Sequence, residues 1–378
     1  GLDLVELMIR VAAGEKLPLA QADVKRNGWS IECRINAEDP FRNFLPSTGR
    51  LVKFQPPKAD MFAADTQHLG GVRVDTGVYD GGEIPMYYDS MIAKLIVHGK
   101  DRNDAIAKMR EALNGFVIRG VSSNIPFQAA LLAHPKFVSG DFDTGFIAEH
   151  YGKGFHAEDV PHSDPDFLLA LAAFMNRRYR ARASRISGQL EGHGVKIGEK
   201  FVVVTVDGEG KQRHVDVSVT DFEGSTGSSA VTLGGKTFQM SSDAALGSVV
   251  VKGLVNGQPF TAQVERGIGK NPLALRVAHN GTQVEATVLS PLGARLMKLM
   301  PYKAPPDLSK YLMSPMPGLL VEVAVQPGQQ VQAGEKLAVI EAMKMENVLF
   351  AAHDGVVSKV SAGKGESLAV DQVILEFA

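Results

Sequence analysis

Roughly the last 65 residues of the chain contain an internal repeat, which restricts this part of the sequence to a β structure. Apolar residues and glycines recur at a spacing of 37 residues. The matching pairs are Gly318 and Gly355, Val323 and Val360, Gly328 and Gly365, Val331 and Leu368, and Leu337 and Ile374. Alternating apolar residues with glycines at the turns are typical of short β-strands. The repeat therefore predicts two similar β units joined close to residue 344.

A single lysine, Lys344, stands at this junction between Met343 and Met345, and we expect it at the tip of a hairpin. Two-residue hairpin turns favour Asn-Gly or Asp-Gly, so these are unusual turn residues. A site that breaks the local turn rule is more often functional than accidental. An amide bond to a lysine removes its charge and makes its side chain a long tether. The alternative is an exposed surface lysine beside two methionines that fill a core.

The tetrapeptide Ala342-Met343-Lys344-Met345, with PMPG at 315–318 upstream, resembles the biotin carboxyl carrier domain. In that family the lysine carries biotin through an amide bond. The resemblance therefore implies covalent biotin on Lys344, a biotinylation motif of Ala342, Met343 and Met345, and biotin protein ligase as a partner. The lipoyl domain shares the double β unit, but its lysine typically follows an aspartate, whereas Lys344 follows a methionine.

Length and composition limit the remaining possibilities. At 378 residues the chain is long enough for two or three domains. A formal net charge of -2 gives no reason to expect nucleic acid or an acidic membrane as a partner. The one cysteine, Cys33, excludes an intrachain disulfide and fits a reducing compartment. No apolar run approaches the roughly 20 residues that span a bilayer. Because Gly1 directly precedes a helical pattern, we expect a fragment of a longer protein.

The front of the chain, 1–151, mixes helical and strand patterns and predicts an α+β domain. We expect helices over Leu2 to Ala13, after the capping residue Asp101, and from Asn124, and strands over Ser30 to Asn36 and Gly71 to Val74.

The middle of the chain, 152–300, combines one very apolar helix with many strands. A helix beginning at Asp164-Pro165 is apolar on nearly every face from Phe167 to Met175, so it must be surrounded. Short strands with Gly-containing turns then predict an antiparallel β-barrel, with this helix at its centre. The expected strands are Phe201 to Val206, Val215 to Val219, Thr237 to Met240, Val249 to Val255, Phe260 to Glu265, Leu273 to Ala278 and Val284 to Leu289.

A connector at 301–312 contains Pro305-Pro306 and predicts a semi-stiff spacer on which the last part, 313–378, can swing. The expected fold is thus multidomain, α+β and then all-β, ending in a flattened β-barrel of the biotinyl/lipoyl type.

Two segments of the front, IECRINAEDP at 31–40 and YYDSMIAKL at 87–95, resemble the C-terminal part of a biotin carboxylase domain, which has the ATP-grasp fold. In that family the arginine matching Arg34 lies in the active site, where a fixed guanidinium stabilises developing negative charge. A structural ion pair of Arg34 with Glu32 or Glu38 is the alternative. The family's ATP-binding loop, metal-binding carboxylates and catalytic base lie upstream of these motifs, so no metal ligands are expected in this fragment.

Together the regions resemble the biotin-bearing subunit of biotin-dependent acyl-CoA carboxylases, most closely the propionyl-CoA branch. The resemblance implies a ligase that uses ATP, Mg and bicarbonate in the complete subunit to carboxylate biotin on Lys344. The carboxyl group would then pass to an acyl-CoA on a carboxyltransferase β subunit, which the barrel region binds. A methylcrotonyl-CoA or acetyl-CoA carboxylase subunit, a non-catalytic biotin carrier and a lipoyl carrier remain as alternatives. The implied location is the cytoplasm or the mitochondrial matrix, with the bacterial cytoplasm favoured.

Overall fold

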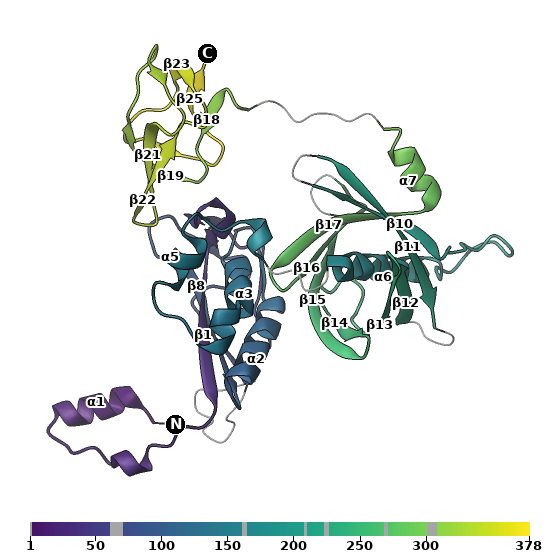
Figure 1. The fold of residues 1–378 in the computed structure, drawn as a ribbon, viewed down its shortest axis with the longest axis horizontal. Helices are drawn as coiled ribbons and strands as arrows, with labels where there is room; N and C mark the ends of the chain where they lie inside the picture. The colour runs from purple at the N-terminus through teal and green to yellow at the C-terminus, as the bar shows by residue number, and fades with distance from the viewer. Residues whose placement is uncertain are drawn as a thin grey trace.

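A computed structural model describes residues 2–60, 71–160, 165–207, 210–222, 227–267, 271–300 and 308–378. The chain forms three bodies (Figure 1), which we call the front region (2–160), the barrel region (165–300) and the C-terminal region (308–378). None of the described helices is long and apolar enough to cross a membrane.

The front region is built on a three-stranded antiparallel sheet with the order β1-β8-β6. Helix α2 begins after Asp101, whose side chain accepts a hydrogen bond from the backbone of Asp104 at 2.9 Å. Its apolar face, from Ala105 to Leu113, is buried against the sheet. The elements are α1 (Leu4–Ala12), η1 (Gln21–Asp23), β1 (Trp29–Asn36), β2 (Glu38–Asp39), η2 (Pro40–Arg42), β3 (Leu45–Pro46), β4 (Gly49–Arg50), β5 (Lys53–Gln55), β6 (Gly71–Thr76), β7 (Glu83–Ile84), β8 (Met91–Gly99), α2 (Arg102–Asn114), β9 (Val117–Arg119), α3 (Ile125–Ala133), α4 (Pro135–Ser139), α5 (Phe146–Tyr151) and η3 (Ala157–Asp159).

Helix α1 is present as predicted, but it stands apart from the rest of the front region (Figure 1). It has no buried residue, although six of its side chains are large and apolar. The apolar side chains of α1 are therefore not packed against any other part of the described chain.

The barrel region confirms the prediction of strands around a central helix. Strands β10 to β17 form a closed antiparallel barrel, and α6 runs through it. All nine residues from Phe167 to Met175 are buried, which is why this helix is apolar on every face. The elements are α6 (Pro165–Ala183), β10 (Lys200–Val206), β11 (Gln212–Asp221), β12 (Ser228–Leu233), β13 (Lys236–Ser241), β14 (Val250–Val255), β15 (Gln258–Arg266), β16 (Ala274–His279), β17 (Thr282–Leu289) and α7 (Pro291–Met297).

One strand of the barrel, β12, is absent from the sequence prediction. Its inward positions are Ser229, Val231 and Leu233, and all three are buried. Since a serine occupies one of them, the alternation of apolar and polar residues is weak there. The predicted helix cap Asp164 lies outside the described residues.

The C-terminal region confirms the internal repeat. It consists of two four-stranded sheets, β18-β25-β23-β20 and β22-β21-β19-β24. Gly328 and Gly365, which match across the repeat, have the same φ of 86°. The elements are β18 (Tyr311–Met313), β19 (Gly318–Val323), β20 (Gln330–Val331), β21 (Lys336–Ala342), β22 (Met345–Phe350), β23 (Gly355–Val360), β24 (Ser367–Leu368) and β25 (Val373–Phe377).

The connector predicted at 301–312 is described only in part, because 301–307 lie outside the described residues. Its last two residues, Tyr311 and Leu312, lie in β18 and pair with β25. The fixed part of the C-terminal region thus begins slightly earlier than the sequence suggests.

The barrel region is held against the front region by polar contacts. Arg119 at the end of β9 donates to Glu265 and to Gln263 of β15, each at 2.7 Å. Gln263 in turn donates to the backbone carbonyl oxygens of Asn114 and Phe116, each at 3.0 Å. Because these groups are half-buried or buried, the two regions form a defined joint.

Candidate functional site

Lys344 lies at the tip of the hairpin between β21 and β22, as predicted. Ala342 pairs with Met345, so Met343 and Lys344 alone form the two-residue turn. Their φ angles are 51° and 62°, as a type I′ turn requires. Non-glycine residues in the left-handed region are disfavoured by a clash of Cβ with the backbone. The turn is therefore strained, and such strain is concentrated at functional positions.

The residues around Lys344 differ sharply in exposure. Lys344 is exposed and Met345 is 40% exposed, whereas Met343 is 4% and Ala342 2% exposed. A small residue at 342 fits because it is enclosed by the core of the C-terminal region. The amine is therefore free to react in solution, while its neighbour on the N-terminal side is anchored.

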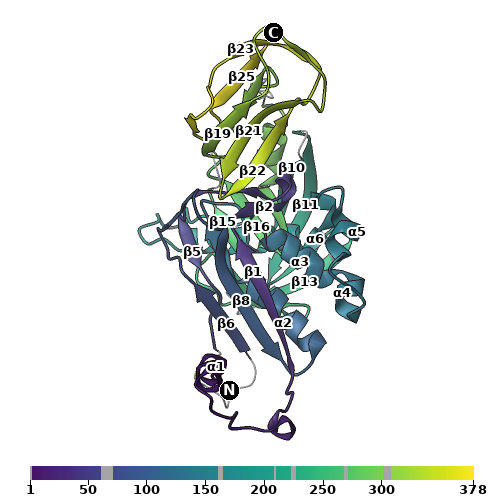
Figure 2. The same ribbon diagram turned by 90° about the vertical axis from the view of Figure 1, so that its left-hand side faces the viewer.

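The anchor of Met343 is the front region. Its side chain belongs to the same apolar cluster as the core of the front region, which includes Ile84 and Ile92. Its backbone N–H donates to the carbonyl oxygen of Met86, in the loop between β7 and β8. Figure 2 shows the ends of β21 and β22 reaching down to this part of the front region. The hairpin tip and the front region thus meet at Lys344's own turn.

Arg34 lies on β1, with its side chain on the open face of the sheet. Its side chain is 66% exposed, and its Nε donates to Glu32 at 3.2 Å. Glu38 instead accepts hydrogen bonds from Asn36 and Ser90. An exposed pair of this kind is weak and holds the arginine only loosely. The guanidinium can therefore leave Glu32 for an anionic group.

The backbone around Arg34 is fixed by a residue whose role the sequence did not reveal. Asn124 was expected to begin a helix, and its side chain makes no capping bond there. Instead it is buried, donates to the carbonyl oxygen of Arg34 at 3.0 Å and accepts from the backbone N–H of Asn36 at 3.0 Å. Gln128, one turn further along α3, donates to the same carbonyl oxygen at 3.3 Å. The only signal in the sequence was an asparagine before Ile-Pro, which equally marks a helix start.

Cys33 precedes Arg34 on β1 and faces the opposite side of the sheet. It is a free, buried cysteine. Burial, with a smaller effect of the nearby Glu32 carboxylate, raises the pKa of its thiol to about 12. A thiol that stays protonated is a poor nucleophile, so Cys33 belongs to the core and not to the chemistry.

In the described part of the chain, no three His, Cys, Asp or Glu side chains are grouped so that they could hold a metal ion. The exposed side chains of Lys344 and Arg34 remain the candidate functional groups of the described part of the chain.

Three known families match successive parts of the chain. Residues 32–149 match the biotin carboxylase C-terminal domain, 168–303 the propionyl-coenzyme A carboxylase BT domain, and 310–377 the family described as biotin-requiring enzyme. The order of the three agrees with the front, barrel and C-terminal regions.

The curated relatives match all three parts at once. The propionyl-CoA carboxylase alpha chain of Ruegeria pomeroyi is 45% identical over 100% of this chain, and the match covers 55% of the relative. The chain is a homologue of propionyl-CoA carboxylase alpha chains. The human mitochondrial alpha chain is 37% identical over 100% of this chain and 50% of its own length. The mouse methylcrotonoyl-CoA carboxylase alpha subunit is more distant, at 30% identity over 100% of this chain and 51% of its own length.

The chain spans about half the length of these carboxylase alpha chains. Among solved structures, the biotin carboxylase domain of a thermophilic 2-oxoglutarate carboxylase is 42% identical over 39% of this chain and 31% of its own, with a TM-score of 0.35.

Proposed function

We propose that this chain is the C-terminal half of the biotin-bearing subunit of an acyl-CoA carboxylase that acts on propionyl-CoA. The observation that carries the proposal is the exposed amine of Lys344 on a strained two-residue turn, in a region that matches biotin-requiring enzymes. An incidental lysine beside core-filling methionines does not explain why Met343 and Lys344, and not asparagine or glycine, occupy the two left-handed positions of this turn.

In this proposal Lys344 holds biotin through an amide bond, and Ala342, Met343 and Met345 form the motif that biotin protein ligase reads. Biotin bound there would carry a carboxyl group between two active sites. The fit is favourable, because Lys344 projects from a tip where no side chain encloses it. The connector at 301–312 is proposed to let this region travel.

The proposed role of Arg34 is electrostatic. Its exposed guanidinium would stabilise negative charge that develops on the biotin ring. Asn124 and Gln128 support this role, since they fix the β1 backbone from which the arginine projects. ATP, Mg and bicarbonate would bind mainly to the half of the subunit that precedes this chain.

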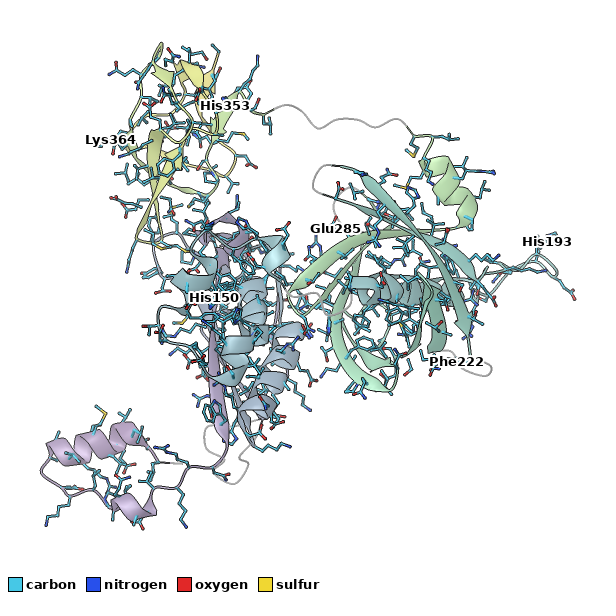
Figure 3. All side chains as sticks on the ribbon, viewed as in Figure 1. His150, His193, Phe222, Glu285, His353 and Lys364 are labelled. Carbon is cyan, nitrogen blue, oxygen red and sulfur yellow. The ribbon has the colours of Figure 1, made fainter. Side chains whose placement is uncertain are left out.

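The proposed partner is a carboxyltransferase β subunit, bound by the barrel region. The match to the propionyl-coenzyme A carboxylase BT domain supports this partner. So does a long loop between α6 and β10, which projects from the barrel with His193 near its end (Figure 3). Ile186, Leu190 and Val195 on this loop are 60%, 76% and 65% exposed. Apolar side chains exposed together on a projecting loop are typical of a protein contact.

The proposal divides the chain into 1–151 (C-terminal part of the biotin carboxylase domain), 152–300 (subunit-binding barrel), 301–312 (connector) and 313–378 (carrier). The bacterial cytoplasm is the proposed location, which the single free cysteine and the similarity to the Ruegeria pomeroyi protein favour.

The attachment is tested by coexpression with a biotin ligase and streptavidin blotting. Wild-type chain should be labelled, and Lys344→Arg should abolish the label while the charge is retained. Lys364→Arg, an exposed lysine in the same region, is the matched control and should leave the label intact. Label that survives in Lys344→Arg would refute the assignment of biotin to this residue.

The role of Arg34 is tested in the full-length subunit. Arg34→Ala should lower the rate of biotin carboxylation by about 10²–10³ while streptavidin labelling stays normal. Arg73→Ala is the control, because Arg73 also lies on the front sheet and pairs with a carboxylate two residues away, Asp75 at 2.8 Å. Equal rates in Arg34→Ala and wild type would favour a structural ion pair or a non-catalytic carrier.

A further inference from the structure

The C-terminal region touches the front region at a second place besides Met343. Leu45, the first residue of β3, is half-buried and packs against the apolar core of the C-terminal region. Figure 2 shows the start of β22, at the hairpin tip, beside β2, the strand that pairs with β3. A side chain of the front region thus helps to close the core of the C-terminal region.

The turn that presents Leu45 is strained. Asn43 and Phe44 have φ angles of 53° and 58°, so two consecutive non-glycine residues are left-handed. The surrounding structure imposes this conformation. The ring of Phe44 packs edge-on against Phe127 at 5.0 Å between centroids, and Asp39 pairs with Leu45 across the short hairpin. Strain of this kind persists where a position must be held, and the position held here is that of Leu45.

The two contact places are tied together into one surface. Glu38, next to Asp39 on β2, accepts a hydrogen bond from the Ser90 hydroxyl at the end of the 85–90 loop. The backbone N–H of Ala37 donates to the carbonyl oxygen of Ser90 at 2.7 Å. Residues 38–46 and 85–90 are therefore one fixed unit, which we call the carrier seat. Leu45 is its apolar contact, and the Met86 carbonyl oxygen is its polar one.

The carrier seat lies at the end of the sheet that carries Arg34. Met91, the first residue of β8 after the seat, pairs with Asn36 on β1, and Arg34 pairs with Lys94. A hairpin tip held on the seat is therefore held at the same end of the sheet as this guanidinium.

We propose that the carrier seat docks the hairpin of Lys344 for the carboxylation half of the reaction. The role in carboxylation rests on the proposed function, whereas the docking itself does not. The contact is small, since it consists of the half-buried Leu45, the buried Met343 and the backbone hydrogen bond to Met86. A small contact suits the C-terminal region, which must also leave the front region in the proposed reaction. The seat fixes the hairpin's position, and the chemistry belongs to other groups.

Hydrogen exchange of the whole chain tests the docking without any activity. Leu45→Asp places a charge against the apolar core and should release the hairpin. Exchange of amides in residues 340–346 should then accelerate by about tenfold or more, because a docked amide exchanges only when the contact opens. Val52→Asp is the control, since Val52 is 69% exposed on the same region, and it should leave these amides unchanged.

Amides of β8 and α2 report whether the front region remains folded in Leu45→Asp. If they also accelerate, the milder Leu45→Ala replaces it, with a smaller acceleration confined to the hairpin. Unchanged exchange at 340–346 in a folded Leu45 variant would overturn the carrier seat.

The role in the reaction is tested in the full-length, biotinylated subunit. The rate with attached biotin, divided by the rate with free biotin, should fall about tenfold in Leu45→Asp, because loss of docking lowers the effective concentration of the attached group. The ratio should be unchanged in Val52→Asp. An unchanged ratio in Leu45→Asp, with hairpin exchange accelerated, would refute the role in carboxylation and leave the docking. Absence of streptavidin label in the wild type would instead refute the proposed function.

Discussion

At the scale of single residues, the backbone of the turn at Lys344 favours different residue types from those that its proposed function needs. The hairpin needs left-handed backbone at Met343 and Lys344, which glycine or asparagine would supply more easily. Attachment of a prosthetic group needs a lysine, and docking needs an apolar neighbour. Met343 and Lys344 occupy the two turn positions although glycine or asparagine there would make the hairpin more stable.

Lys344→Gly should therefore make the hairpin more stable than Lys344→Ala, by about 1 kcal/mol, because glycine tolerates a positive φ and alanine does not. Amide exchange in residues 336–350 measures this difference. Both variants should lack a streptavidin label. Equal protection in the two would show that the turn is not strained at this residue.

Cys33 provides a second test at this scale. Burial raises its pKa to about 12, so the folded protein binds the thiol proton more tightly than the unfolded chain does. The contribution to stability is complete below the ordinary thiol pKa of 9.0 and is lost as the pH rises toward 12.

We therefore expect the free energy of unfolding to fall between about pH 9 and pH 11 less steeply in Cys33→Ala than in wild type. Urea denaturation at several pH values measures these slopes. Iodoacetamide should label Cys33 at pH 8 only after unfolding, and labelling of the folded protein would contradict the burial.

At the scale of secondary-structure elements, α6 determines the barrel region. Nine consecutive buried residues leave this helix no face for solvent, so the eight strands close around it. Its last turns carry Arg177 and Arg178, which leave the barrel and bond to Asp221 and to the Ala244 carbonyl oxygen. The helix thus changes from a core element to a surface element along its length.

Phe174→Ala should destabilise the barrel region by about 3–5 kcal/mol, because a fully buried ring is replaced by a cavity. Leu254→Ala on β14 removes a side chain that is 45% exposed and should change stability by no more than about 0.5 kcal/mol. Urea denaturation followed by circular dichroism compares the two. A loss below about 1 kcal/mol in Phe174→Ala would mean that the barrel does not depend on this packing.

At the scale of the whole molecule, the regions are joined in two different ways. The front and barrel regions share half-buried ionic and amide contacts around Arg119 and Gln263. The C-terminal region touches the front region at the carrier seat, through Met343 and Leu45. The larger polar joint agrees with a barrel region that stays fixed on the front region. The smaller contact agrees with a C-terminal region that can leave the front region.

Arg119→Ala should lower the stability of the joint by about 1–3 kcal/mol, since it leaves the Glu265 carboxylate, on a side chain only 19% exposed, without its cation. Lys252→Ala is the control, because Lys252 links the same two regions through an exposed pair with Glu111, with side chains 67% and 63% exposed. Urea denaturation followed by Trp29 fluorescence measures both, and equal effects would contradict the special role of Arg119. The double variant Arg119→Ala with Glu265→Ala should recover part of the loss.

Local pattern was enough for much of this protein. The 37-residue repeat determined the two sheets of the C-terminal region, and an all-round apolar helix among short strands determined the barrel. The motif around Lys344 determined its place at a hairpin tip. Each of these depends on periodicity or on neighbouring residues, which a sequence displays directly. The strand β12 was missed because a buried serine broke that periodicity.

Only the tertiary structure revealed the contacts that support the candidate site. Asn124 lies 90 residues from Arg34 and yet holds its carbonyl oxygen. Leu45 and Met343 are almost 300 residues apart in sequence, and only the packed chain brings both to the boundary of the same two regions. Hydrogen bonds and apolar contacts between distant segments follow from how the regions pack, and no local pattern encodes them. For that reason the sequence predicted Lys344 as the attachment site, while the carrier seat was visible only in the folded structure.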